Sequence, residues 1–277
     1  MKISGKTRLL GVLGQPLEHS QSPALHNYSA GLLSEDSAYI PLAYDSRDLG
    51  GLLKVLWDLG FLGLNVTVPF KEKIAALFPA SDLLSVNTLY RGDSYWECAS
   101  TDGSGFLLSL KKWGLFHAGQ TLAVLGNGGA ALSLVRAWKD SQPGSRILVF
   151  RRSKEKDSLF EHLGGSNVEF IDLSPAALAG ELIGSGPTLL VQATSAPLHG
   201  HDLSEFVGAL DNLEGAFVDM LYGNYCSALL VEARNRKIPA YDGLGMLVGQ
   251  ALQSQKLWWG RSAPFDDVLT YLSGVTK

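Results

Sequence analysis

The chain has 277 residues, of which 46% are hydrophobic and 18% charged, a composition that suits a folded globular protein and excludes a disordered one. Its formal net charge of -4 gives no support for a nucleic-acid partner. The cysteines, Cys98 and Cys226, lie in no C-x-x-C or Cys/His cluster, so neither a disulfide framework nor a metal site is expected. No apolar run approaches the roughly 20 residues that span a membrane, and we expect a cytoplasmic protein.

The first part of the chain alternates strand and helix patterns. Strands are predicted at residues 8–13, 38–42 and 63–68, and an amphipathic helix at 48–59 with Leu49, Leu52, Leu53, Leu56 and Leu59 directed inward. Another helix begins at Ser22-Pro23, with Ser22 as N-cap and Pro23 at the first helical position. This alternation predicts an α/β layer that binds its ligand at the strand ends.

Polar residues follow several of these strands. Ser20 and Ser22 precede a helix, where their hydroxyls can meet a ligand or simply cap the turn. Asn65 and Thr67 share one face of their strand, which indicates either a site or a solvent-facing edge. Lys71, which follows this strand, can belong to the same site or to an ordinary charged first turn of a helix. Later, Thr101 or Asp102 can cap a helix at residues 105–113, near which a domain boundary is expected.

A glycine-rich turn opens the second part of the chain. The apolar run at 122–125 leads into Gly126-Asn127-Gly128-Gly129 and a helix at 130–140. The spacing Gly126-x-Gly128-x-x-Ala131 is the G-x-G-x-x-A form of the dinucleotide fingerprint. Gly126 permits the tight turn, Gly128 allows close approach of a pyrophosphate, and a small Ala131 allows helix and strand to pack closely. The helix N-terminus favours the anion.

The strand that follows, at residues 146–150, ends in Arg151 and Arg152, with Lys156 nearby. An NAD site commonly has an acidic residue at this place, whereas guanidinium groups suit a 2′-phosphate. The basic end therefore favours NADP over NAD, with a solvated charge run as the alternative, chiefly for Lys154 and Lys156.

The remaining patterns continue the alternation to the C-terminus. Strands are predicted at residues 168–173, 188–192, 216–220 and 238–241, and helices at 175–182, 227–235, 243–260 and 267–272. The strand at 188–192 ends in Thr194 and Ser195, whose hydroxyls would lie near a cofactor in a doubly wound fold.

Six collinear segments resemble the shikimate dehydrogenase family over nearly the whole chain. GQPLEHSQSPALHN at 14–27 is similar to the substrate loop of that family, and NVTVPFK at 65–71 to its N-V-T-x-P-x-K motif. The others are SVNT at 85–88, STDGSG at 100–105, GNGGAA at 126–131 and GLGMLVGQA at 243–251. The chain departs from the family at 192–198, QATSAPL, where the usual Gly-Met is lost, at Tyr222-Gly223-Asn224, and at Arg151-Arg152-Ser153, where Asn-Arg-Thr is usual.

The resemblance implies a role for each matching residue. Lys71 and Asp102 would be the catalytic pair. The substrate-binding residues would be Ser20, Ser22, Asn65, Thr67, Lys71, Asn87, Asp102, Tyr222 and Gln250, with Tyr222 also bordering the nicotinamide. The cofactor-binding residues would be Gly126, Asn127, Gly128, Gly129, Ala130, Arg151, Arg152, Ser153, Lys156, Thr194, Gly243 and Met246. No metal is required, because NADP(H) carries the hydride.

The resemblance implies a two-domain α/β oxidoreductase. Residues 1–103 and 243–277 would form the α/β substrate-binding domain, and 104–242 a Rossmann-type NADP-binding domain. The expected reaction is the reversible NADP-dependent reduction of 3-dehydroshikimate to shikimate, in chorismate and aromatic amino acid biosynthesis, by a monomer or homodimer. Two alternatives are a quinate/shikimate dehydrogenase that uses NAD and a catalytically idle relative that binds a ligand.

Overall fold

The computed structural model describes residues 3–45, 48–163 and 167–275. It divides into two compact units. The first unit contains the chain up to Gly105 and again from Val248, and the second unit runs from Phe106 to Leu247. These divisions fall inside two helices, α4 (Asp102–Lys112) and α8 (Leu244–Trp259), whereas the sequence-based boundaries were 103/104 and 242/243.

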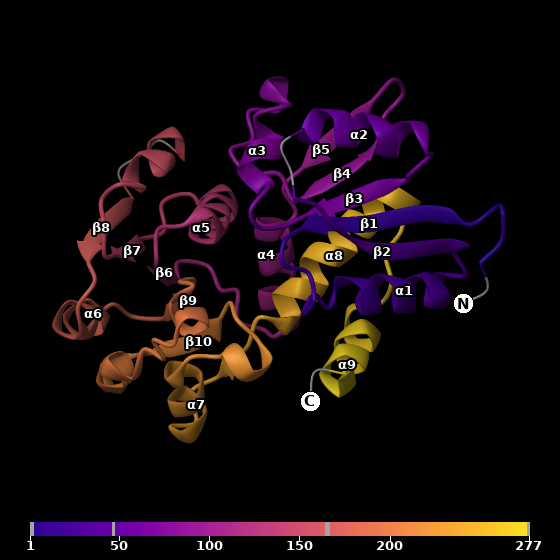
Figure 1. Ribbon diagram of the computed structural model, residues 1–277. Coiled ribbons are helices and arrows are strands. Elements are labelled where there is room, and N and C mark those ends of the chain that lie inside the picture. The colour runs from indigo at the N-terminus through magenta and orange to yellow at the C-terminus, as the bar shows by residue number, and fades with distance from the viewer. Residues whose placement is uncertain (1–2, 46–47, 164–166, 276–277) are drawn as a thin grey trace. The chain divides into compact units, whose positions relative to one another are not determined.

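A five-stranded sheet in the order β2-β1-β3-β4-β5 forms the centre of the first unit (Figure 1). The strands β2, β1 and β3 are parallel to one another, and β4 is antiparallel to both of its neighbours, β3 and β5. The strands are β1 (Arg8–Gly14), β2 (Ser37–Ala43), β3 (Gly63–Val66), β4 (Thr88–Arg91) and β5 (Trp96–Ala99). Since β3 pairs with both β1 and β4, it is an internal strand, which excludes a solvent-facing edge for Asn65, while Thr67 lies just after the strand.

Period-two alternation sends the residues of β3 to opposite faces of this sheet. Leu64 and Val66 join the buried cluster with Leu53 and Leu56 of α2, while Asn65 between them faces away from that cluster. A second cluster contains Leu10, Val12, Tyr39 and Trp258 of α8. Asn65, a polar residue in the middle of an apolar strand, is therefore directed toward α8.

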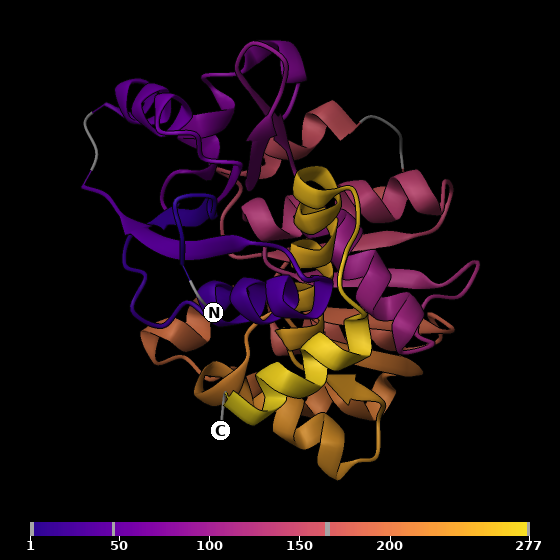
Figure 2. The same ribbon diagram turned by 90° about the vertical axis from the view of Figure 1, so that its right-hand side faces the viewer.

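The helices of the first unit begin and end close to the expected residues. They are α1 (Ser22–Leu33), α2 (Leu49–Asp58), α3 (Lys71–Ala75), α9 (Phe265–Val275) and most of α8. Asp48 caps α2 by accepting a hydrogen bond from the Gly51 backbone N–H. Figure 2 shows α9 beside α1, where Tyr28 and Tyr271 stack with their ring centroids 3.9 Å apart.

Two details of these helices differ from the prediction. Ser22 is the first residue of α1 and not its N-cap, a position that Gln21 occupies without a side-chain hydrogen bond. Leu59 is 65% exposed, because α2 ends at Asp58 and the chain turns away at Gly60, where φ is +78°. The other leucines of that helix pack inward or against the core, as predicted.

The second unit contains a six-stranded parallel sheet in the order β11-β10-β9-β6-β7-β8. Its strands are β6 (Thr121–Leu125), β7 (Ile147–Arg151), β8 (Val168–Asp172), β9 (Thr188–Gln192), β10 (Gly215–Asp219) and β11 (Ala240–Tyr241). Numbered within the unit, this is the doubly wound Rossmann order. Its topological switch point lies between β6 and β9, which is where such sheets bind ligands.

Helices cover both faces of this sheet (Figure 1). Leu122 and Val124 of β6 pack in one cluster with α5 (Gly129–Ser141), while Ala123 and Leu125 pack in the other. The second cluster also receives α6 (Pro175–Leu182) and α7 (Ala228–Asn235). A strand buried on both faces explains the uninterrupted apolar run at 122–125. Among the described residues, no helix is long and apolar enough to cross a membrane.

Candidate functional site

Lys71 and Asp102 form an ion pair in the first unit, with 2.6 Å between Nζ and Oδ2. Lys71 is the first residue of α3, and Asp102 is the first residue of α4, where the helix dipole favours a carboxylate. The Lys71 side chain keeps 29% of its surface exposed, and that of Asp102 keeps 11%. The pair is therefore sheltered, yet its ammonium group remains accessible to a ligand.

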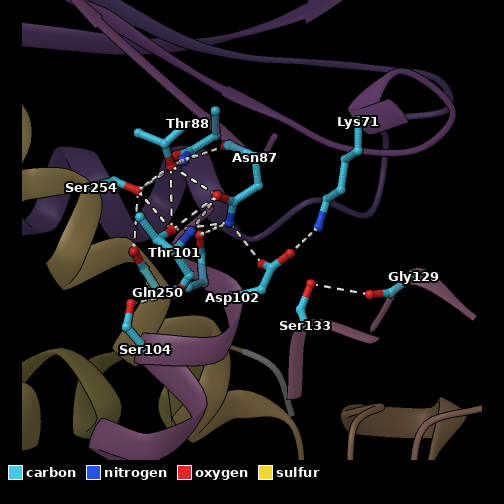
Figure 3. A network of polar contacts seen from close by, with 11 residues as sticks. Lys71, Asn87, Thr88, Thr101, Asp102, Ser104, Gly129, Ser133, Gln250 and Ser254 are labelled. Atoms are coloured by element: carbon cyan, nitrogen blue, oxygen red, sulfur yellow. Dashed lines mark hydrogen bonds and ion pairs between the residues drawn. The ribbon is translucent and has the colours of Figure 1, made fainter. Parts of the chain in front are cut away.

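Asn87 holds the carboxylate from the other side (Figure 3). Its Nδ2 donates to Asp102 Oδ1 at 2.7 Å and lies 3.4 Å from Gln250 Oε1. Its Oδ1 accepts from the backbone N–H of Thr101 at 2.7 Å. The Thr101 carbonyl accepts from the Gly105 N–H, so α4 begins at Asp102 rather than at Gly105. Since its carboxylate serves Lys71 and Asn87, Asp102 does not act as the helix cap that the sequence left open.

Asn65 is 5% exposed, and its side chain is fully engaged within the protein. Its Oδ1 accepts from the Tyr39 hydroxyl at 2.8 Å. Its Nδ2 donates to Ser254 Oγ at 3.0 Å and lies within reach of the Asn87 carbonyl and Thr88 Oγ1. Both hydrogens of the amide are engaged by protein partners, and the expected hydrogen bond of Asn65 to a substrate stays a prediction.

Ser20 lies in the loop between β1 and α1, Ser22 is the first residue of α1, and Thr67 directly follows β3. Thr67 donates its backbone N–H to the Leu13 carbonyl, and its side chain lies so close to Gly14 that a Cβ there would come within 2.3 Å of Thr67 Cγ2. Ser20 Oγ lies 3.4 Å from the Ser22 backbone N–H. Burial raises the pKa of Tyr39 well above its usual range, and a hydrogen bond with the Ser22 side chain opposes this.

In the second unit, the glycine turn has the geometry of an anion cradle. Gly126 has a φ of +111°, and a Cβ there would meet Thr194 Cγ2 at 3.0 Å, so Thr194 lies beside the turn. A Cβ at Gly128 would meet no described atom within 4 Å, so the space before it is open. Gly128 is the N-cap of α5 and offers no side-chain hydrogen bond to its first turn. The N–H groups from Gly129 onward can therefore bind a phosphate.

The two arginines at the end of β7 differ in their surroundings. Arg151 has 9% of its side chain exposed and pairs with Asp157 at 2.6 Å and Asp172 at 2.8 Å. These contacts use Nε and Nη1 of its guanidinium group, and the expected phosphate contact of Arg151 stays a prediction. Arg152, Ser153 and Lys156 are exposed, and Arg152 and Lys156 form no ion pair with any described residue. Their donors fit a nucleotide phosphate.

The other expected cofactor residues lie on segments that follow β10. Gly243 is packed so tightly that a Cβ would come within 2.2 Å of the Met220 carbonyl oxygen. Met246 is 9% exposed and packs in the core of the second unit. Tyr222, which the sequence grouped with the substrate ligands, also belongs to the second unit, and burial raises the pKa of its hydroxyl. Asp219 fixes the segment by accepting from Leu221, Ser227 N–H and the Ser227 hydroxyl.

A cavity of about 540 Å³ in the second unit is not part of this site. It is lined by Phe116, Gln142 and Arg146 among others, at the amino ends of β6 and β7. Parallel sheets of this order bind ligands at the carboxyl ends of their strands, where the glycine turn lies. In the part of the chain that the structure describes, no three His, Cys, Asp or Glu side chains gather as a metal site requires.

The sequence missed several residues that hold the site together. Thr88 and Ser254 lie 2.8 Å apart between their hydroxyl oxygens, and both contact Asn65. Ser254 lies four residues after Gln250 on α8, so helical spacing could have placed it on the same face. Asp157 and Tyr39 carried no comparable signal, since neither matches a motif position.

Known proteins resemble this chain over its full length. The sequence profile of the shikimate dehydrogenase substrate binding domain matches residues 12–89. The Shikimate dehydrogenase (NADP(+)) of Acidiphilium cryptum is 36% identical over 97% of this chain and 96% of its own, and that of Lactococcus lactis is 33% identical over 97% of each. The solved Shikimate 5-dehydrogenase of Thermus thermophilus in complex with shikimate is 27% identical, with a TM-score of 0.80 over 98% of this chain and 99% of its own. The chain belongs to the shikimate dehydrogenase family.

Proposed function

We propose that this protein catalyses the reversible, NADP-dependent reduction of 3-dehydroshikimate to shikimate in the chorismate and aromatic amino acid pathway. The observation that carries the proposal is the Lys71–Asp102 ion pair, 2.6 Å long and braced by Asn87. The names of the two relatives, Shikimate dehydrogenase (NADP(+)), support the same reaction and cofactor. A relative that had become a mere ligand-binding protein would have no need of a lysine and a carboxylate in this arrangement.

Lys71 acts as the proton donor and acceptor. In the direction of reduction, its ammonium group donates a proton to the oxygen of the carbonyl being reduced and stabilises the charge that develops there. In the reverse direction the amine accepts the hydroxyl proton. Asp102 keeps Nζ oriented, and Asn87 keeps Asp102 in place through Oδ1. When bound, NADPH supplies the hydride.

The substrate is held by polar groups of the first unit. Asn87, Gln250 and Thr67 hydrogen-bond the ring hydroxyls, and Ser20 and Ser22 bind the carboxylate at the start of α1. Asn65 supports the pocket through Tyr39 and Ser254. The match of residues 12–89 to a substrate binding domain supports the assignment of substrate binding to the first unit.

The second unit binds NADP. The turn from Gly126 to Ala130, including Asn127, holds the pyrophosphate at the N-terminus of α5, and Thr194 lies beside it. Arg152, Ser153 and Lys156 hold the 2′-phosphate. Gly243 and Met246 lie on the segment that borders the nicotinamide.

The proposal is tested by mixing the purified protein with shikimate and NADP⁺ and following the absorbance of the reduced nicotinamide. We expect turnover with this pair, and slower turnover when NAD⁺ replaces NADP⁺ or quinate replaces shikimate. A higher kcat/KM with quinate and NAD⁺ than with shikimate and NADP⁺ would identify the protein as a quinate/shikimate dehydrogenase that uses NAD. Tight binding of shikimate without turnover with either cofactor would overturn the enzymatic proposal.

A further inference from the structure

The loop that follows β7 is closed by an ion pair between its own two ends. Arg151 is the last residue of β7, and its Nε donates to Asp157 Oδ2 at 2.6 Å, six residues further along the chain. The exposed residues Arg152, Ser153 and Lys156 lie inside the loop that this pair closes. The ends of the loop are thus fixed by a contact that is 9% exposed on the arginine side and 24% on the aspartate side.

The same aspartate connects the loop to the glycine turn. Asp157 Oδ1 accepts from Asn127 Nδ2 at 3.0 Å, so its two oxygens serve two different segments. Asn127 Nδ2 also donates to the Ser153 carbonyl at 2.9 Å. The Gly126 backbone N–H donates to the Phe150 carbonyl, which completes the connection between the turn and the strand end. The two phosphate-binding segments therefore share one small network.

The charges in this network make its role distinct from phosphate binding. Arg151 faces two carboxylates, Asp157 and Asp172, so its single positive charge is more than neutralised. Because the Arg151 side chain is 9% exposed, loss of its carboxylate partners would leave a buried charge uncompensated, which gives the pairing a structural role. Arg152 is exposed and unpaired among the described residues, so the loop presents that charge to solvent.

We propose that Asp157, through Arg151 and Asn127, is the positioning residue for recognition of the 2′-phosphate of NADP. It holds Arg152 and Ser153 at a fixed place relative to the glycine turn, so that the pyrophosphate and the 2′-phosphate are bound by one pre-formed surface. Pre-forming the loop raises affinity because less conformational entropy is lost on binding. This inference rests on the proposed use of NADP, and it assigns Arg151 a role different from direct phosphate contact.

The test compares Asp157→Asn with Asp172→Asn, a matched control. Both substitutions remove one negative charge next to Arg151, but only Asp157 closes the loop and contacts Asn127. If simple electrostatics governed binding, both variants would bind the NADP⁺ phosphate more tightly. The positioning role predicts the opposite for Asp157→Asn: about tenfold weaker NADP⁺ binding, the factor typical of losing a charge-assisted hydrogen bond. Asp172→Asn should bind NADP⁺ as the parent protein does.

Binding is measured by titration calorimetry with NADP⁺ and with NAD⁺, without substrate, alongside the thermal midpoint of each variant. Weaker NADP⁺ binding with little change for NAD⁺ supports the inference, because NAD⁺ has no 2′-phosphate. Arg152→Ala should weaken NADP⁺ binding as well, and combining it with Asp157→Asn should add little, since both act on one contact. Arg151→Lys, which keeps the charge but not the bidentate reach, provides a second variant should Asp157→Asn fail to fold.

Unchanged NADP⁺ binding by Asp157→Asn, or equal weakening by Asp157→Asn and Asp172→Asn, overturns the inference while the proposed function stands. If the parent protein binds NADP⁺ but turns over no shikimate, the proposed function fails and the positioning role is still decided by the titrations. If the parent protein binds no NADP⁺, both are overturned.

Discussion

Lys71 is the residue on which the proposed chemistry depends, since its ammonium group has one carboxylate partner and a partly open side chain. Lys71→Met removes the proton donor and keeps much of the aliphatic volume. We expect kcat to fall by a factor of roughly 100 to 10,000, the contribution typical of a general acid or base. Steady-state turnover of shikimate, with NADP⁺ binding measured separately, checks this prediction.

Lys73→Met is the matched control for that substitution. Lys73 lies two residues further along α3, is exposed, and contacts the Phe70 ring at 5.8 Å rather than a carboxylate. Its loss should leave kcat within about twofold, because an exposed charge of this kind contributes little. Equal kcat in the Lys71 variant and the parent protein would remove Lys71 from the catalytic role.

His26 is fully buried and should make the protein sensitive to acid. Its ring stacks on Tyr39 with the centroids 4.3 Å apart, and burial lowers its pKa from 6.5 to about 3. The folded state therefore keeps His26 neutral, while the unfolded chain takes up a proton below pH 6.5. Because the unfolded state binds more protons, the free energy of unfolding falls with decreasing pH from 6.5 toward 3, by up to about 1.4 kcal/mol per pH unit.

Urea unfolding at several pH values in the upper part of that range, where ordinary carboxylates stay ionised, measures this slope. His26→Gln cannot titrate, so it should flatten the slope even though it lowers stability at neutral pH. His199→Gln, a change at an exposed histidine, should leave the slope as it is. A slope that survives in His26→Gln would assign the acid sensitivity to other groups.

Among the elements, α4 and α8 approach each other at two glycines of the first unit. A Cβ on Gly105 would lie 2.2 Å from the Gln250 backbone nitrogen, and one on Gly249 would lie 2.1 Å from the Gly105 carbonyl oxygen. Gly105→Ala or Gly249→Ala should therefore force the helices apart and cost about 1–3 kcal/mol. Because Asp102 and Gln250 lie on these helices, we also expect KM for shikimate to rise. Thermal unfolding and steady-state kinetics measure the two effects.

Gly31→Ala provides the control for a helical glycine. Gly31 lies in α1, is exposed, and a Cβ there would meet nothing within 4 Å. The substitution should be neutral or stabilising by up to about 1 kcal/mol, since alanine favours the helix. Thermal midpoints that change equally at positions 31 and 105 would contradict the close helix contact.

Most elements could be predicted because each has a strong local pattern. The strand at 188–192 and the helix at 175–182 have the predicted bounds, since apolar period and Ser174-Pro175 mark them clearly. The start of α4 was harder to predict, because Thr101 and Asp102 resemble simple capping residues. Only the tertiary contacts with Asn87 and Lys71 decide that these side chains serve the site instead.

For the candidate site, the sequence indicated the residue types but not their partners. The motifs placed Lys71, Asn87 and Asp102 on three separate segments, and the structure brings them together. The sequence suggested four phosphate ligands at the end of β7, namely Arg151, Arg152, Ser153 and Lys156, but not that Arg151 pairs with Asp157 and Asp172. An ion pair between side chains of a loop leaves no periodic trace in a sequence, so these partners required coordinates.

For the molecule as a whole, each of the two units has hydrophobic cores of its own, and each is proposed to bind one ligand. The first unit has its cores on the two faces of the β2-β1-β3-β4-β5 sheet, and the second has its own on the faces of the parallel sheet. A ligand stabilises the elements it contacts, in proportion to its concentration over its dissociation constant. Each ligand alone should therefore protect mainly the unit that holds its proposed contacts.

Hydrogen exchange with mass spectrometry can measure this division. NADP⁺ alone should slow exchange at the amides of 126–131 and 151–157, because these segments hold its phosphates in the proposed site. Shikimate alone should slow exchange around residues 65–71, 85–88 and 100–105, the segments that surround Lys71 and Asp102. Since slower exchange reports a higher free energy of local opening, the two patterns should differ in place as well as in size. Protection by NADP⁺ alone that is centred on 65–105 would contradict the assignment of the cofactor to the parallel sheet.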